Sequence, residues 1–156
     1  MTINNIRVKV SKKYSNIYKE LISEQVLHSK IFDSHGDIFT LCCALGYKYN
    51  ECKPLEKGEP LFFSHYFTKE NEVAIRAIVV AATDKNYMIL EEEKEKELIS
   101  IAEQYAEGGM QILIKNVLSP FLLENDEDYV LSFNKDSYVE KELLSFIYNE
   151  YTKAPF

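Results

Sequence analysis

The clearest pattern of apolar positions in the chain lies within residues 34–46. Four apolar residues recur at i, i+3, i+4 and i+7, the spacing of one helix face: Ile38, Leu41, Cys42 and Leu45. Ser34 and Asp37 have the S/T-x-x-D/E spacing of a capping box at the start of this helix, and Gly46 is a candidate C-cap. Because most neighbouring positions are also apolar, the pattern predicts a buried central helix with Leu41 and Leu45 in the core.

Period-two alternation of apolar and basic residues over 6–10 predicts a short N-terminal strand with one wet face. Helical spacing then predicts a helix of roughly 11–28. Thr68 is expected to cap a helix over 69–82. Its apolar face consists of Val73, Ala74, Ala77, Ile78 and Ala81, and Ile75 and Val80 broaden it.

Glycine and proline divide the second half of the chain into further predicted helices. Gly108 and Gly109 are expected to end a helix that resumes its spacing at Leu98. Another helix is expected to begin at Met110 and to stop before Pro120. A last helix is predicted over 136–151.

Segments between these helices lack helical spacing. Residues 48–60 are predicted as a loop, and the aromatic stretch 61–67 as either a strand or an apolar turn. The sequence therefore predicts a mainly α fold, α+β through its short N-terminal strand, in a single helical domain of residues 1–156 packed around the central helix.

Charge is unevenly distributed along the 156 residues, whose formal net charge is −7. Residues 1–53 have a balance of +3 and the remainder a balance of −10. The candidate DNA contacts therefore belong to the N-terminal third: Arg7, Lys9, Lys12 and Lys13. Because the acidic remainder repels phosphate, we expect DNA to be bound weakly or indirectly.

The N-terminal order of strand, serine and amphipathic helix is also how a ribbon-helix-helix protein begins. In that class the strand pairs with a second copy to contact DNA, so a DNA-binding regulator is one alternative function. An edge strand of a mixed domain is the more common origin of the same pattern. No apolar run approaches the ~20 residues of a membrane-spanning helix, and we expect a cytoplasmic protein without a membrane partner.

The three cysteines and three histidines do not form a recognisable site. Cys42, Cys43 and Cys52 lack the paired spacing of a zinc site, and two of them fall within the central helix. No catalytic residue, metal or cofactor is therefore predicted. A small enzyme with an unrecognised site is a third alternative.

Two blocks of sequence resemble a known family. Asp37-Ile-Phe-Thr-Leu-Cys-Cys-Ala-Leu-Gly-Tyr47 is similar to a pattern D-x-F-x-L-A-x-A-L-G-[FY], and residues 101–113 to an A-x-x-Y-A-x-G-G stretch before an apolar segment. Both patterns occur in small proteins encoded beside bacterial DNA phosphorothioation (Dnd) gene clusters and other antiphage islands. The chain departs from the family at Cys42 and Cys43, where alanine is usual, and its C-terminal third does not match.

The resemblance implies a non-catalytic accessory subunit of a prokaryotic defence or DNA-modification complex, working beside a larger ATPase or nuclease. Aromatic content fits a protein-binding role, because 11 Tyr and 9 Phe exceed the need of one small core. The candidate protein interface consists of two groups, the stretch 61–67 and the last helix: Phe62, Phe63, Tyr66, Phe67, Tyr138, Tyr148 and Tyr151.

Overall fold

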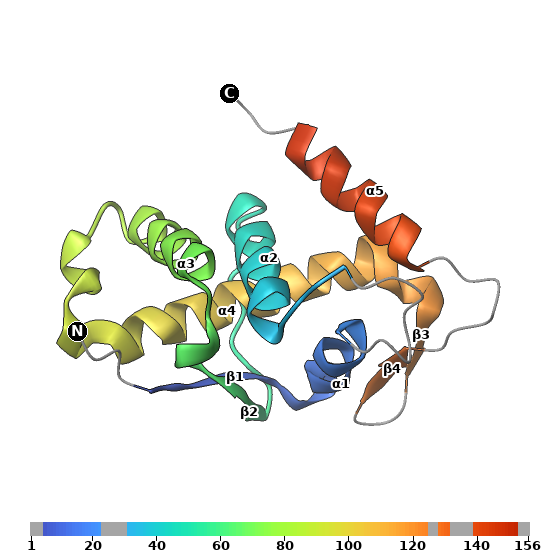
Figure 1. Cartoon of the computed structure of the whole chain (residues 1–156), viewed down its shortest axis with the longest axis horizontal. Coiled ribbons are helices and arrows are strands. Elements are labelled where there is room, and N and C mark those ends of the chain that lie inside the picture. The colour runs from blue at the N-terminus through green and yellow to red at the C-terminus, as the bar shows by residue number, and fades with distance from the viewer. Residues whose placement is uncertain (1–4, 23–30, 125–127, 132–138, 153–156) are drawn as a thin grey trace.

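The computed structural model describes residues 5–22, 31–124, 128–131 and 139–152, and its fold is mainly α, as the sequence predicts (Figure 1). Its α-helices are α1 (Lys12–Leu21), α2 (His35–Lys48), α3 (Lys69–Ala82), α4 (Glu95–Leu113) and α5 (Val139–Thr152). No helix within these described residues is long and apolar enough to cross a lipid bilayer.

The predicted N-terminal strand is β1 (Arg7–Ser11), which pairs antiparallel with β2 (Gly58–Phe63). The alternation is confirmed, because Val8 and Val10 are buried while Arg7 and Lys9 are exposed. The strand therefore finds its partner within its own chain, in contrast to the pairing with a second copy in a ribbon-helix-helix dimer. The aromatic stretch is both a strand and a turn, since β2 leads into the 3₁₀ turn η1 (Ser64–Tyr66).

Helices α2 and α4 cross at a close backbone contact (Figure 1). A Cβ atom at Gly46 would lie 2.0 Å from the carbonyl oxygen of Tyr105. A Cβ atom at Gly108 would lie 1.8 Å from the Glu51 carbonyl oxygen, and a Cβ atom at Gly109 would lie 1.6 Å from the Cys42 carbonyl oxygen. These positions admit only hydrogen, so the glycines serve helix packing.

Two predicted helix ends are therefore wrong. Gly46 is not a C-cap, because α2 continues to Lys48. Gly108 and Gly109 do not end a helix either, because α4 runs through both of them and continues as a π-helical turn, η4 (Ile114–Leu118).

The position of α2 in the core is confirmed, whereas two details of its prediction need correction. Leu45 is buried, but Leu41 is only partly buried at the edge of the core. Ser34 occupies the N-cap position without a side-chain cap bond. Asp37 instead accepts a hydrogen bond from the backbone N–H of Asp33 and one from Asn71 Nδ2, at 3.2 and 3.1 Å.

The start of α3 is as predicted, but its buried face is not. Thr68 and Asn71 form a reciprocal capping box. The buried face consists of Asn71, Ile75 and Val79, whereas Val73 in the predicted face is 65% exposed. Because Asn71 donates to Asp37 of α2, this hydrogen bond fixes which side of α3 faces the core.

The connections around α4 are short turns. Asp84 and Lys85 adopt positive φ angles of 55° and 62° after α3 ends. The 3₁₀ turns η2 (Tyr87–Leu90) and η3 (Glu92–Lys94) then lead into α4. Beyond η4, the 3₁₀ turn η5 (Ser119–Phe121) contains Pro120, where the sequence predicts a helix stop.

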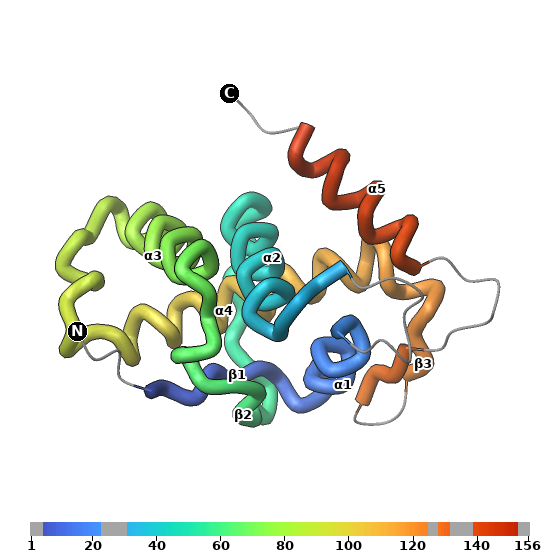
Figure 2. Tube along the Cα trace, viewed as in Figure 1, coloured from blue at the N-terminus to red at the C-terminus, as the bar shows by residue number. Residues whose placement is uncertain are grey.

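A second strand pair, β3 (Leu122–Glu124) with β4 (Tyr129–Leu131), is not predicted by the sequence. The backbone N–H of Leu131 donates to Glu20 Oε2 at 2.7 Å and so ties the pair to α1. Two predicted helix termini lie outside the described residues, namely 23–28 after α1 and 136–138 before α5. Figure 2 shows α5 projecting from the end of the molecule that η4 and the β3–β4 pair occupy.

The glycine contact predicts that Gly109→Ala destabilises the protein. Alanine is favoured over glycine inside a helix by about 1 kcal/mol, whereas overpacking costs about 1–3 kcal/mol. The steric cost should prevail because the obstructing atom is the Cys42 backbone carbonyl, which cannot rotate away. We expect a net loss of about 1–2 kcal/mol in denaturant unfolding, from an overpacking cost in the upper part of that range.

Gly58→Ala is the matched control, since its Cβ would meet only side-chain atoms, those of Leu55 at 3.3 Å and Lys9 at 3.9 Å. It should change the free energy of unfolding by about 0.5 kcal/mol at most. Equal stabilities of the two variants would contradict the close contact.

Candidate interaction surfaces

A groove between β1 and α4 brings together two of the four predicted DNA contacts. Arg7 and Lys9 line it from β1, and Lys96, Ser100 and Glu103 line it from α4. Three cations therefore surround a single carboxylate in a protein whose net charge is −7. Lys96 lies 87 positions after Lys9 in the sequence, so the sequence pattern alone did not connect the two.

The other two predicted DNA contacts have different surroundings. Lys13 Nζ lies 3.0 Å from Glu56 Oε2 and 4.9 Å from the centre of the Tyr14 ring. Lys12 is exposed at the start of α1, and its backbone N–H donates to the Lys57 carbonyl oxygen. Arg7 and Lys9 therefore form the groove without these two lysines.

Two carboxylates of α4 hold β1 in place. Glu103 Oε2 accepts a hydrogen bond from the backbone N–H of Lys9 at 2.7 Å. Glu107, which is only 3% exposed, accepts one from Ser11 Oγ at 2.6 Å. Burial raises the pKa of both carboxyls, that of Glu103 to about 7, although the Lys9 N–H and charge oppose the rise at Glu103.

Sequence reasoning did not single out these glutamates. The available signal was their position, since Glu103 and Glu107 stand one turn apart in the apolar second half of α4. Glutamates on the buried side of a helix need a hydrogen-bond donor on the facing element, which β1 supplies.

The predicted aromatic interface of residues 61–67 is largely internal. Phe67 is buried, and its ring packs against those of Phe62 and Phe39 with centroids 5.1 and 5.7 Å away. Phe63 lies beneath Arg7, whose guanidinium carbon is 5.2 Å from the ring centre. Tyr66 is 63% exposed, so it is the part of this patch that remains available to a partner.

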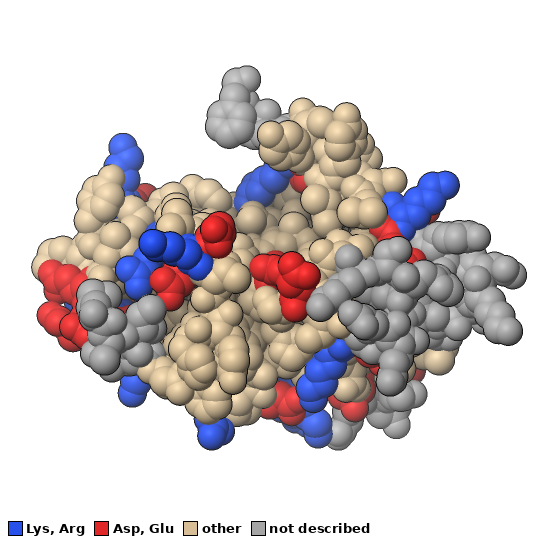
Figure 3. Space-filling view, in the orientation of Figure 1, with Lys and Arg blue, Asp and Glu red and all other residues tan. Residues whose placement is uncertain are grey.

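Helix α5 exposes a continuous apolar face. Leu144, Tyr148 and Tyr151 follow each other at i, i+4 and i+7 and are 54%, 67% and 81% exposed. On the opposite side, Val139 and Leu143 are buried. Figure 3 shows a largely uncharged surface over this helix. Tyr138, the remaining candidate, lies outside the described residues.

One polar contact fixes α5 to the end of α2. Glu150 Oε2 lies 2.6 Å from both Lys48 Nζ and the Tyr49 hydroxyl. Because the carboxylate is held by two donors, the helix is oriented with its tyrosines pointing away from the core. The exposed face of α5 is therefore a positioned surface.

Among the described residues, the two cysteines of α2 are unsuited to nucleophilic chemistry. Burial raises the pKa of both the Cys42 and Cys43 thiols to about 12, so neither forms a thiolate at neutral pH. Cys52 is exposed. At the start of α2, Ser34 Oγ and His35 Nε2 are buried without a hydrogen-bond partner. Within the part of the chain that the structure describes, no cluster of three or more His, Cys, Asp or Glu could hold a metal ion.

These features define a small, mainly α protein whose distinctive surfaces are a basic groove and an exposed aromatic helix. The family model described as DNA sulphur modification system-associated protein 4 matches residues 7–144, and the chain belongs to that family. The resemblance found in the sequence is thereby confirmed, and the match extends into the C-terminal third, which the two sequence blocks did not cover. Comparisons with curated proteins and with solved structures gave no significant match.

The matched range contains both helices of the glycine contact and the whole basic groove apart from Asn5 and Ile6. It ends within α5 at Leu144, so Tyr148 and Tyr151 lie beyond it.

The raised pKa of Glu103 predicts a pH dependence of stability. The folded state holds this proton more tightly than an ordinary carboxyl of pKa 4.5. The resulting stabilisation is complete below about pH 4.5 and is lost as the pH rises through about 7. Glu103→Gln stays neutral and should raise the free energy of unfolding at pH 8 by about 2 kcal/mol relative to its effect at pH 5.

Glu97→Gln, at an exposed position on the same helix, is the control for removing a glutamate from α4. Urea titrations at the two pH values provide the measurement. An effect of Glu103→Gln that does not change with pH would contradict the prediction.

Proposed function

We propose that this protein is a non-catalytic accessory subunit of a prokaryotic antiphage defence or DNA-modification and restriction complex, and that it acts in the cytoplasm by binding a larger ATPase or nuclease. Membership of a family associated with DNA sulphur modification supports the setting. The exposed face of α5 is the observation on which the binding role depends.

Three properties of α5 favour contact with a protein. Its apolar face consists of two tyrosines and a leucine, and tyrosine is enriched at binding hot spots. Each tyrosine buries a large area for the cost of few rotatable bonds. The Lys48–Glu150 contact orients the helix before any partner arrives, which reduces the entropy lost on binding.

A non-catalytic role is also consistent with the chemistry of the described residues. The two thiols of α2 are buried and protonated. Both glutamates with raised pKa on α4 accept hydrogen bonds from β1, so a structural role accounts for their burial. The protein then contributes to a complex through its shape and surface.

The double variant Tyr148→Ala/Tyr151→Ala should lose its partner. When the tagged protein without substitutions is purified from its native host, the partner subunit should be purified with it. Truncation of a hot spot costs at least ~2 kcal/mol of binding, so retention should fall about thirtyfold. Protection against phage by the intact gene cluster should fall with it, while the thermal midpoint stays unchanged because both side chains are exposed.

Tyr87→Ala is the matched control, since Tyr87 on η2 has the same exposed fraction as Tyr148, 67%. It should retain both the partner and phage protection. Loss of protection only in variants that also unfold would refute the proposal, as would full retention of the partner by the α5 double variant.

A second role, weak contact with DNA, is favoured by the groove between β1 and α4. Arg7, Lys9 and Lys96 offer positive charge to phosphate, whereas the protein as a whole repels it. This arrangement supports contact with DNA that a larger subunit already holds. Isolated protein should bind duplex DNA only weakly at ~150 mM salt.

Arg7→Ala/Lys9→Ala should weaken this binding and reduce the magnitude of its salt dependence by about two charges. The control, Lys13→Ala/Lys53→Ala, removes two lysines that are already paired with Glu56 and Glu51. Equal effects of the two double variants in fluorescence anisotropy would exclude a specific role for the groove. Submicromolar binding that depends on Arg7 and Lys9 would instead favour a DNA-binding regulator.

A further inference from the structure

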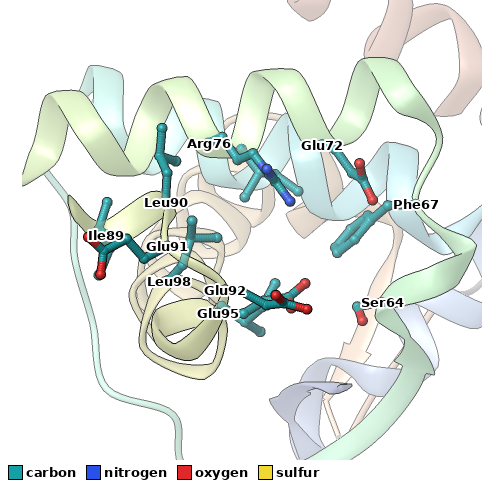
Figure 4. A pocket seen from close by; sticks show the side chains of 12 residues that line it. Ser64, Phe67, Glu72, Arg76, Ile89, Leu90, Glu91, Glu92, Glu95 and Leu98 are labelled. Carbon is teal, nitrogen blue, oxygen red and sulfur yellow. The ribbon is translucent and has the colours of Figure 1, made fainter. Parts of the chain in front are cut away.

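A small pocket lies between α3, the turns η2 and η3, and the start of α4 (Figure 4). It is at the opposite end of α4 from η4, the turn against which α5 packs. The space inside it that the centre of a water molecule can reach is about 30 Å³, so the pocket is narrow. Six apolar side chains from α3, η2, α4 and the residue after η1 line it: Phe67, Ile75, Ile89, Leu90, Leu98 and Ile99.

The charged groups around this apolar lining are mostly negative. Figure 4 shows Arg76 reaching into the pocket from α3, with Glu92 and Glu95 on the opposite wall. Glu72 and Glu91 also line it, so the lining has four carboxylates and one guanidinium, although Figure 4 shows the Glu91 carboxylate turned away from Arg76. Among the described residues, no carboxylate lies within ion-pair distance of Arg76, so the opposite charges stay separated across the pocket.

We propose that this pocket receives an arginine side chain from a protein partner. The methylene groups of an arginine would contact the apolar lining, while its guanidinium would reach Glu92 and Glu95. The planar guanidinium presents several donors at once, which suits carboxylates that come from consecutive turns of the chain. The excess of three negative charges complements a cation.

The same charges disfavour other occupants. A phosphate or a carboxylate would gain one contact with Arg76 but would meet four glutamates. A nucleotide would bring several negative charges into the same space. The arginine site is independent of the α5 surface, and it adds a second contact at the other end of α4.

The probe for this site is N-acetyl-arginine amide, titrated into the full chain with labelled methyl groups. We expect saturable chemical-shift changes at the methyls of Ile75, Ile89 and Leu98. The citrulline analogue has nearly the same shape without the charge and should bind at least about fivefold more weakly. Equal binding of both compounds, or no change at the pocket methyls with arginine, would overturn the proposal.

Two variants should change the affinity in opposite directions, which unfolding cannot imitate. Glu92→Gln/Glu95→Gln should weaken arginine binding about fivefold, whereas Arg76→Gln should strengthen it about threefold. The control, Glu93→Gln/Glu97→Gln, removes two glutamates of the same acidic run that do not line the pocket, and should leave the affinity unchanged. An equal loss in the control would show that only overall charge matters and would overturn the assignment.

Two further outcomes would identify a different occupant and so reject the proposal. One is shift changes with N-acetyl-glutamate amide that Arg76→Gln abolishes, which would indicate an anion site. The other is shift changes on increasing the protein concentration alone, which would indicate a second copy of the chain. Because the α5 variants do not alter this pocket, failure of the arginine site leaves the test of the α5 surface unaffected.

Discussion

The close backbone contact between α2 and α4 is the constraint on which the other features of this fold depend. Helices usually pack with their axes about 8–10 Å apart, separated by side chains. Here Gly46, Gly108 and Gly109 leave no room for even a methyl group. Because α4 is fixed against α2 in this way, its remaining sides are presented to other elements in a defined order.

These sides of α4 position the pocket, the basic groove and the exposed face of α5. The start of the helix forms the floor of the pocket with Leu98 and Ile99. Its middle binds β1 through Glu103 and Glu107 and completes the basic groove. Its end continues into η4, against which α5 packs. A single glycine contact thus positions groups that are far apart in the sequence.

Local signals in the sequence were sufficient for the helices and for β1. Thr68 begins α3 because the capping box is a contact between neighbouring residues. The sequence analysis placed helix ends wrongly at Gly46 and Gly108. In a sequence, a glycine that ends a helix cannot be distinguished from a glycine that allows another backbone to approach the helix. The buried side of α3 was missed because it depends on Asn71 and Asp37, residues of different helices.

The candidate surfaces were also predictable to different degrees, according to whether their residues are neighbours in the sequence or come from separate segments. Tyr148 and Tyr151 are exposed, as an interface requires, and their binding role stays a prediction. Phe67 was assigned to an interface although it belongs to the core, since the rings that surround it come from α2 and β2. The place of Lys96 in the basic groove and the proposed arginine pocket could be recognised only in the folded structure, because the residues that line each of them come from separate segments.

The hydrogen bond between Lys9 and Glu103 has a consequence for how the protein behaves at high concentration. A two-stranded sheet has exposed edges, and a strand with free N–H groups is a template for intermolecular β-structure. The Glu103 carboxylate occupies one such donor, and an irregularity between Val8 and Lys9 interrupts the regular spacing that an incoming strand would need. The partly buried Glu103, whose raised pKa costs stability above neutral pH, thus also protects the N-terminal strand from aggregation.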